Sequence, residues 1–255
     1  MVSVHRFHQI SEVDHRILNP LSLEQLLLLG DICKLQPAQR HLDLASGKGE
    51  MLCQYAHRHG TTGLGIDVFP PYTSMANARA VELGVDHLVH FIEGDAALHE
   101  AEPGSFDVVS CIGATWIGGG LSGTLELMRA PLHATGWLLV GEAYWNDQPP
   151  DAAKAALHLG DEFTDLSGNL GRFEDAGLDL VEMVLATPET WDRYATSQWL
   201  NVSTWLDEHA DDPDADDVRA IRDDARRSYL RYGRRYLGWG VFVLRRMRRA
   251  ASLDM

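Results

Sequence analysis

The chain has 255 residues, 45% of them hydrophobic, which fits one large domain or one domain with a small cap. Its formal net charge of −15 argues against a general binder of nucleic acid or of anionic membranes, since both partners are polyanions. The cysteines are scattered without a C-x-x-C spacing, and no apolar run is long enough to span a bilayer. Because the amino end also lacks a signal-peptide pattern, we expect a cytoplasmic protein with no membrane partner.

The first 36 residues are expected to form a helical cap segment. Ser22 and Gln25 have the spacing of a capping box, which predicts that a leucine-rich helix begins at residue 23. Its leucines recur at helical spacing, so this helix is expected to pack beside a sheet.

Residues 41–52, HLDLASGKGEML, combine a short apolar strand, a glycine turn and the start of a helix. Glycines let the backbone approach a ligand closely, and the first turn of a helix offers free N–H groups. The next strand ends in Asp67, about 20 residues after the turn, where a carboxylate can bind ribose hydroxyls. A dinucleotide site is disfavoured, because Leu52 stands where the third glycine is needed and Asp43 would repel a pyrophosphate. The cradle suits a ligand with a positive end.

Strand and helix patterns alternate from residue 40 to residue 145. The expected strands cover residues 40–45, 62–67, 88–93, 106–113 and 136–142. The expected helices cover residues 50–59, 72–83, 96–99 and 121–129. This alternation predicts an α/β fold with a doubly wound, mostly parallel sheet and helices on both faces. Ligands bind such sheets at the carboxyl ends of the strands, so the predicted pocket wall comprises residues 43–49, 67–68, 94–96, 111–116 and 142–145.

The segment Asp43-x-Ala45-x-Gly47-x-Gly49 resembles motif I of the class I S-adenosylmethionine (SAM)-dependent methyltransferases, usually D/E-x-G-x-G-x-G. Alanine replaces the first glycine, which leads us to expect a negative φ angle at Ala45. The segments FIEGDAA, FDVVSCIGATW and GWLLVGEAYW resemble the regions of the third, fourth and fifth strands in that family. The resemblance covers most of residues 40–145. It implies a seven-stranded Rossmann-like fold whose antiparallel last strand lies between the fifth and sixth strands.

The same resemblance implies SAM as the cofactor and S-adenosylhomocysteine (SAH) as the product. It assigns Asp43 to the methionine end, Asp67 to the ribose hydroxyls and Asp95 to the adenine. One acidic residue at a strand end is often a helix cap, but three at successive strand ends are harder to explain in that way. The residues expected to bind the cofactor are Asp43, Ala45, Ser46, Gly47, Gly49, Asp67, Val68, Gly94, Asp95, Ala96, Cys111, Ile112 and Gly113.

The connection of residues 187–236 is too long for a bare loop and is expected to form a helical insertion before the last strand. Trp191, Tyr194 and Trp199 are expected either to pack on the sheet or to line a lid over the acceptor. A second helix is expected to begin at Asp212 and Pro213, a cap residue followed by proline. Arginines gather at the end of that helix, as its dipole favours, and this explains them without a nucleic acid. They are Arg226, Arg227, Arg231, Arg234 and Arg235.

The residues expected near the transferred methyl group are Trp116, Glu142, Tyr144 and Trp145. The catalytic candidates are His15, Trp116, Glu142 and Tyr144. A carboxylate at Glu142, at the end of the fifth strand, would orient or deprotonate an acceptor or pair with its amine. A bond from this carboxylate to neighbouring backbone or to an arginine is the alternative interpretation. The N-terminal segment often covers the active site in this family, which draws attention to His15 and Asn19. A surface histidine and a turn asparagine are the plainer interpretation of that pair. The histidines are dispersed, so no metal site is predicted.

The sequence therefore predicts a SAM-dependent methyltransferase that acts on a nitrogen or oxygen atom of a small-molecule acceptor, with no nucleic-acid partner. The alternatives are an RNA or protein methyltransferase and a non-catalytic SAM-binding module. The predicted organisation is a cap segment (1–36), a SAM-binding core (37–186), a helical lid (187–236), and a final strand and tail (237–255). No oligomeric state is predicted.

Overall fold

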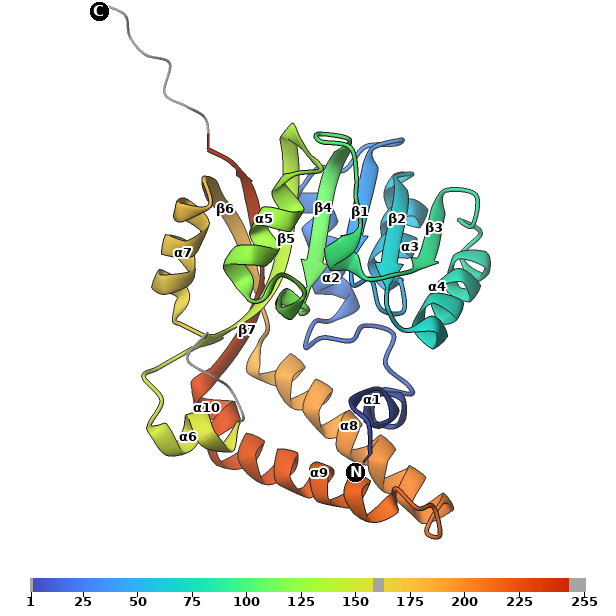
Figure 1. Cartoon of the computed structure of the whole chain (residues 1–255), viewed down its shortest axis with the longest axis vertical. Helices are drawn as coiled ribbons and strands as arrows, with labels where there is room; N and C mark the ends of the chain where they lie inside the picture. The colour runs from blue at the N-terminus through green and yellow to red at the C-terminus, as the bar shows by residue number, and fades with distance from the viewer. Residues whose placement is uncertain (1, 158–162, 248–255) are drawn as a thin grey trace, which may run out of the picture.

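The computed structural model describes residues 2–157 and 163–247 of the chain. A central seven-stranded sheet with helices on both faces organises it (Figure 1), which confirms the predicted α/β class. The strands are, in chain order, β1 (Arg40–Leu44), β2 (Thr62–Asp67), β3 (Val89–Glu93), β4 (Phe106–Ile112), β5 (Leu132–Trp145), β6 (Leu178–Leu185) and β7 (Leu237–Arg246). The helices are α1 (Val4–Ser11), α2 (Leu23–Ile32), α3 (Glu50–His59), α4 (Pro70–Glu82), α5 (Leu121–Arg129), α6 (Asp151–Ala156), α7 (Leu166–Asp175), α8 (Pro188–Glu208), α9 (Ala215–Ser228) and α10 (Arg234–Tyr236).

The strands lie in the order β3-β2-β1-β4-β5-β7-β6. Strands β1 to β5 pair in parallel, whereas β7 runs antiparallel between β5 and β6. This position of β7 confirms the expected antiparallel last strand. Strands β1 and β4 are neighbours although β2 and β3 separate them in the chain. Such a switch point is where open α/β sheets bind ligands.

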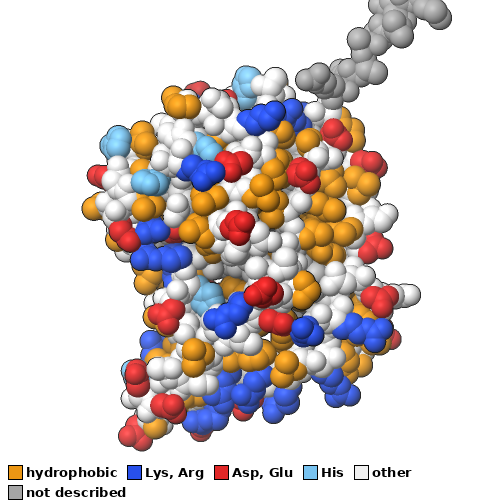
Figure 2. Space-filling view, turned by 180° about the vertical axis from the view of Figure 1, so that it is seen from behind, with side chains coloured by type: hydrophobic (Ala, Val, Ile, Leu, Met, Phe, Trp, Pro, Cys, Tyr) orange, Lys and Arg blue, Asp and Glu red, His pale blue; other side chains and the backbone are white. Residues whose placement is uncertain are grey.

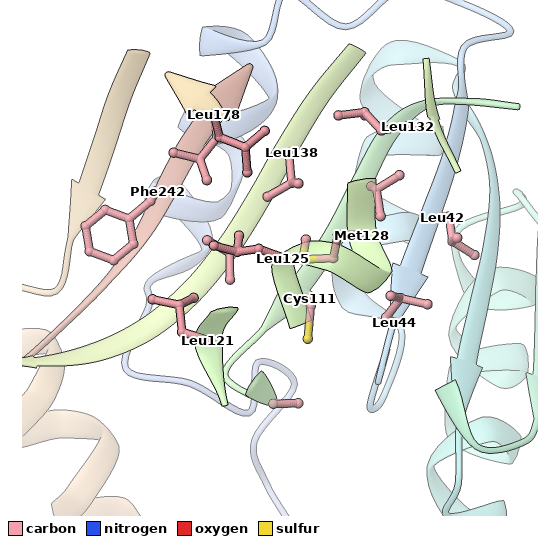
Figure 3. Packing of buried hydrophobic residues seen from close by; sticks show 14 of the residues in the cluster. Leu42, Leu44, Cys111, Leu121, Leu125, Met128, Leu132, Leu138, Leu178 and Phe242 are labelled. Carbon is pink, nitrogen blue, oxygen red and sulfur yellow. The ribbon is translucent and has the colours of Figure 1, made fainter. Parts of the chain in front are cut away.

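Alternate side chains of each strand enter two apolar layers, one on each face of the sheet. On β7, Phe242 belongs to one layer and Val241 to the other. Helices α5 and α7 cover the first layer, and Figure 3 shows Leu125 and Met128 of α5 within it. Helices α2 and α3 cover the second layer through residues such as Leu29. Neighbouring residues of a strand therefore lie on opposite faces of the sheet, and residues two positions apart lie on the same face.

A layer of helices lies below the sheet in Figure 1, at the end to which the parallel strands point. Helices α1, α8 and α9 pack together there through Ile10, Val202, Leu206 and Val218. Two short 3₁₀ turns, η1 (Ala96–Leu98) and η2 (Thr115–Gly118), follow β3 and β4, and a π-helical turn, η3 (Tyr229–Gly233), joins α9 to α10. The expected helical insertion is present and faces the candidate site.

Local signals predict the start of α2 but not that of α9. The capping box of Ser22 and Gln25 begins α2 as predicted, with both hydrogen bonds at 3.1 Å. The predicted start of the second lid helix is wrong, because α9 begins at Ala215 rather than at the proline two residues earlier. The Asp212 carboxylate accepts the N–H of Asp214 at 2.9 Å, so this acid closes a turn before the helix instead of capping it.

Candidate active site

The turn between β1 and α3 forms the floor of the candidate site. Ala45, Gly47 and Gly49 have positive φ angles of 58°, 53° and 74°. The expected negative φ at Ala45 is therefore wrong. The left-handed conformation brings the next residue back toward β2, where the N–H of Ser46 donates to the carbonyl oxygen of Ile66 at 2.9 Å. Alanine adopts this conformation at a cost of about 1–2 kcal/mol, and the turn requires it.

Above the turn lies a cavity of about 780 Å³. It is bounded by the carboxyl ends of the strands, by helix α8, and by residues 12–21, which we call the N-terminal strap. The three acidic residues Asp43, Asp67 and Asp95 all line it. They come together because β1, β2 and β3 are parallel and end at the same edge of the sheet.

Backbone N–H groups hold two of these carboxylates. Asp67 accepts the N–H groups of Gly47 at 2.8 Å and of Phe69 at 2.9 Å, which ties the glycine turn to the end of β2. Asp95 accepts the N–H of Ala97 at 2.9 Å and caps η1. Burial raises the pKa of Asp67, and its two N–H partners act against that rise because they stabilise the ionised form.

Asp43 is the most deeply placed of the three, at 4% exposure. Burial raises its pKa to about 7, a 2.5 Å hydrogen bond from the Ser110 hydroxyl opposes the rise, and Asp67 adds to it. A positively charged ligand group beside Asp43 would restore the ionised form. The cavity therefore suits a ligand with a cationic end at Asp43 and hydroxyl groups at Asp67.

Most residues expected to bind the cofactor line this cavity: Asp43, Ala45, Ser46, Gly47, Gly49, Asp67, Val68, Asp95, Ala96, Ile112 and Gly113. Gly94 and Cys111 are not part of its lining. Cys111 lies on the α5 side of the sheet, fully buried near Leu121 and Leu125 (Figure 3). Gly94 donates its N–H to the Asp67 carbonyl at 3.0 Å and so extends the β2–β3 ladder.

Among the four catalytic candidates, Trp116 lines the cavity, whereas Glu142 and Tyr144 do not. Their side chains lie on the same face of β5 as that of Val140, which belongs to the layer under α5 and α7. Tyr144 packs against Phe242 there, with ring centroids 6.5 Å apart. The strand period places both side chains on the α5 and α7 side of the sheet, and neither residue is part of the cavity lining.

His15 lines a second cavity, of about 670 Å³, between the strap and α8. Its Nε2 lies 2.8 Å from Ser197 Oγ, its ring meets Tyr194 edge-on, and burial lowers its pKa. Asn19 lines both cavities and donates to the carbonyl oxygen of Ile112 at 3.3 Å. The N-terminal segment does cover the site, and His15 helps to fasten it.

Lys48, which sequence analysis did not single out, fastens the strap to the glycine turn. This side chain is 7% exposed, and its ammonium group donates to the carbonyl oxygens of Glu12 at 2.6 Å and His15 at 2.8 Å. A third carbonyl, that of Val13, lies at 3.3 Å. A lysine inside a glycine turn is the one sequence signal that pointed to this contact.

Glu12, also missed, fastens the strap to α8 and α4. Its buried carboxylate accepts the hydroxyl groups of Tyr194 at 2.8 Å and Tyr72 at 3.1 Å, and the amide of Gln198 at 3.2 Å. Burial acts to raise the pKa of Glu12, but His8 and the two hydroxyl groups outweigh it, so that the pKa is lowered. An ionised carboxylate therefore links three elements around the cavity.

Helix α8 contributes two of the three aromatic residues expected in a lid. Trp191 and Tyr194 line the cavity, and the indole N–H of Trp191 donates to the carbonyl oxygen of Leu237 at 3.1 Å. Trp199 instead packs edge-on against Tyr229, with ring centroids 5.9 Å apart. The third aromatic residue thus joins α8 to the helices behind it.

Comparison with known proteins finds relatives over nearly the whole chain. A methyltransferase-domain family model matches residues 42–132. A SAM-dependent methyltransferase from Geobacter sulfurreducens, solved in complex with SAH, is 43% identical, with a TM-score of 0.90 over 96% of this chain and 99% of that chain. One from Thiobacillus denitrificans, also solved with SAH, is 42% identical, with a TM-score of 0.90 over 95% of this chain and 99% of that chain. The uncharacterized protein YjhP of Escherichia coli (strain K12) is 44% identical over 246 residues, 95% of this chain and 99% of that protein.

No helix in residues 2–157 and 163–247 combines the length and the apolar character needed to cross a membrane. These residues also contain no group of three or more His, Cys, Asp or Glu side chains placed so as to hold a metal ion.

Proposed function

Because the chain belongs to the class I SAM-dependent methyltransferases, we propose that it transfers the methyl group of SAM to a nitrogen or oxygen atom of a small-molecule acceptor. The observation that carries the small-molecule part is the cover over the site. Tyr194 and Gln198 of α8 bond to Glu12 of the strap, and Asn201 of α8 bonds to the carbonyl oxygen of Ser11. An acceptor that fits beneath this cover is small.

The residues present fit SAM by their chemistry. Asp67 is assigned to the ribose hydroxyls, Asp95 to the adenine amino group and Asp43 to the ammonium group of the methionine. The left-handed turn at Gly47 and Gly49 has no Cβ atoms and lines the cavity, so a ligand can lie close to its backbone. When bound, SAM supplies a methyl group already activated by its sulfonium for in-line displacement.

The side of the cavity formed by α2, α8 and β7 is apolar and is the proposed acceptor chamber. It is lined by Ile17, Leu21, Leu26, Met51, Ile112, Trp191 and Trp239. The indole N–H of Trp191 is already bonded to the backbone, so the ring offers its apolar surface to a ligand. These residues exclude water and hold an acceptor in line with the methyl group. Tryptophan faces also attract cations, which favours a planar or amine-bearing acceptor.

In this proposal the core of residues 37–186, completed by β7, binds the cofactor. The segment of residues 1–36 and the insertion of residues 187–236 close over the acceptor. Lys48 links the two parts, because it belongs to the glycine turn and holds the strap.

Label transfer tests the proposal. The protein is incubated with methyl-labelled SAM and a cytosolic extract, and the products are separated by size. Label in the low-mass fraction is the expected result and yields a compound to identify. Label in RNA or protein would instead favour a macromolecular methyltransferase. SAH binding without transfer to any fraction would favour the non-catalytic SAM-binding module.

Trp191→Ala is expected to lower kcat/KM for the acceptor so identified by at least about tenfold, since the ring forms part of the chamber wall. SAH affinity, measured by calorimetry, should change by less than about twofold. Trp199→Ala is the matched control, because that ring packs on Tyr229 outside the cavity. Equal losses of activity in the two variants would remove Trp191 from the acceptor site.

A macromolecular acceptor would require a basic track leading to the cavity. Figure 2 shows Lys and Arg side chains gathered along the lower edge of the molecule, where α9 lies, with Asp and Glu side chains beside them. Arg226 pairs with Asp223 at 3.0 Å, and Arg234 pairs with Asp192 at 3.1 Å. These pairs support a role for the arginines within the protein.

Reversing Arg231 and Arg235 to glutamate together should therefore leave methyl transfer within about twofold of the wild type, since exposed ion pairs contribute little. Arg235 pairs with Asp147 at 3.5 Å, and both side chains are exposed. Arg235 also lies over the ring of Tyr236, and Arg231 over the ring of Tyr232, each next to it in the chain. A loss of transfer well beyond this range would count for the RNA alternative.

A further inference from the structure

Three buried polar side chains form a hydrogen-bonded chain from β1 to β4 beneath the cavity. Asp43 lies opposite Ser110 in the register of these strands, and His41 precedes Asp43 by two residues on the same face. Ser110 Oγ lies 2.5 Å from Asp43 Oδ1 and 2.7 Å from His41 Nε2. All three side chains are at most 4% exposed, next to apolar residues such as Val108. Polar groups are stable in such a layer because they bond to one another.

The hydrogen positions follow from the donors available. An ionised Asp43 can only accept, so the Ser110 hydroxyl donates to it. Ser110 Oγ then accepts from His41, which places the ring proton on Nε2. The other nitrogen, Nδ1, is buried with no hydrogen-bond partner among the described residues. Burial lowers the pKa of His41 to about 3, so this ring is neutral near pH 7 and the chain of donors points one way, toward Asp43.

We propose that Ser110 and His41 are positioning residues that keep the Asp43 carboxylate ionised, with its second oxygen free to bind the ammonium group of the cofactor in the cavity. This inference rests on the proposed function, because it takes SAM and SAH as the ligands. Each donor polarises the next, so the Ser110 hydroxyl is a stronger donor when His41 bonds to it. A hydrogen bond to the ionised form favours that form against the effect of burial.

The other ionisable groups near Asp43 do not supply this effect. Asp67, at the end of β2, raises the pKa of Asp43. Tyr55 of α3 donates its hydroxyl to a backbone carbonyl, and burial raises its pKa, so it remains neutral. Burial likewise raises the pKa of the Cys111 thiol on β4. The hydroxyl bond is therefore what opposes the burial of the carboxylate.

The test compares SAH binding by the wild-type chain and by Ser110→Ala, in calorimetric titrations from pH 6.5 to pH 8.5. Loss of one charge-assisted hydrogen bond is expected to raise the pKa of Asp43 by about one unit. With a wild-type pKa of about 7, the ratio of dissociation constants, variant over wild type, should then grow from about 1.3 at pH 8.5 to about 8 at pH 6.5. The sign follows because protonation removes the negative charge that attracts the ammonium group. Taking the ratio at each pH cancels the titration of SAH itself.

His41→Leu tests the chain from its far end and should give the same trend with a smaller rise at pH 6.5. Thr124→Val is the matched control, since the buried Thr124 hydroxyl donates to the carbonyl oxygen of Thr115 at 2.6 Å from a helix on the other face of the sheet. It should lower the thermal stability and leave the ratio independent of pH. A ratio independent of pH in both Ser110→Ala and His41→Leu would overturn the inference while the proposed function stands. Failure of the wild-type chain to bind SAH at any pH would overturn both.

Discussion

Replacing Asp67 with alanine is expected to raise the dissociation constant for SAH by at least about 100-fold. In the proposed assignment of Asp67 to the ribose, two hydrogen bonds from hydroxyl groups to its carboxylate would be lost, and each such charge-assisted bond contributes about 1.5–3 kcal/mol. The N–H groups of Gly47 and Phe69 would also lose their acceptor, which loosens the turn that forms the floor of the site. Isothermal titration with SAH measures the effect directly.

Asp107→Ala is the matched control for this change. The Asp107 carboxylate also accepts a backbone N–H, that of Arg40 at 2.9 Å. It lies at the start of β4, at the amino ends of the parallel strands and away from the cavity. Its loss should lower the stability slightly and leave SAH affinity unchanged. If Asp67→Ala bound SAH as tightly as this control, Asp67 would have no part in the cofactor site.

Gly49→Ala is expected to destabilise the folded protein by about 3–4 kcal/mol, combining a left-handed backbone with overpacking. Gly49 has a φ of 74°, and a Cβ atom there would lie 2.6 Å from the Cβ of Ala76 and 2.6 Å from the ring of Phe91. These neighbours are buried, so they have little room to move. The free energy of unfolding in urea measures the loss.

Gly84→Ala separates the two contributions. Gly84 has a similar φ of 68°, but a Cβ atom there would meet nothing within 4 Å. This control should therefore lose only the backbone contribution, about 1–2 kcal/mol. Equal losses at the two positions would mean that α3 and α4 can move apart at Gly49, and that close packing there is not what requires glycine.

Local patterns were enough to predict most elements of the fold. Apolar periodicity and end signals predicted helices at residues 50–59 and 121–129, and α3 and α5 have those bounds. Strand β5 shows the limit, because it was predicted over residues 136–142 and extends further at both ends. The added residues include polar ones that a rule based on buried apolar runs leaves out. A register shift between Phe106 and Val108, where β4 pairs with β5, accommodates part of the extra length.

The candidate site was predictable where topology alone decides it. Asp43 and Asp67 meet because parallel strands end at one edge, and this follows from the order of elements. The position of the Glu142 side chain depends on the face of the sheet on which it lies. The sequence does not show that face, because residues on both sides of Glu142 in a buried strand are apolar. The contact between Lys48 and Glu12 joins positions 36 residues apart. A lysine inside a glycine turn draws attention to Lys48, but no local pattern identifies the segment that it contacts.

Strand β7 lies between β5 and β6 in the sheet, although it follows both in the chain. During translation, β5 and β6 therefore leave the ribosome before β7, the strand that pairs with both, has been synthesised. During that interval β5 presents an open hydrogen-bonding edge rich in apolar side chains, which is a template for incorrect pairing. The sheet is completed only when residues 237–246 insert between two strands that are already made, so the nascent chain depends on its last strand to protect its earlier ones.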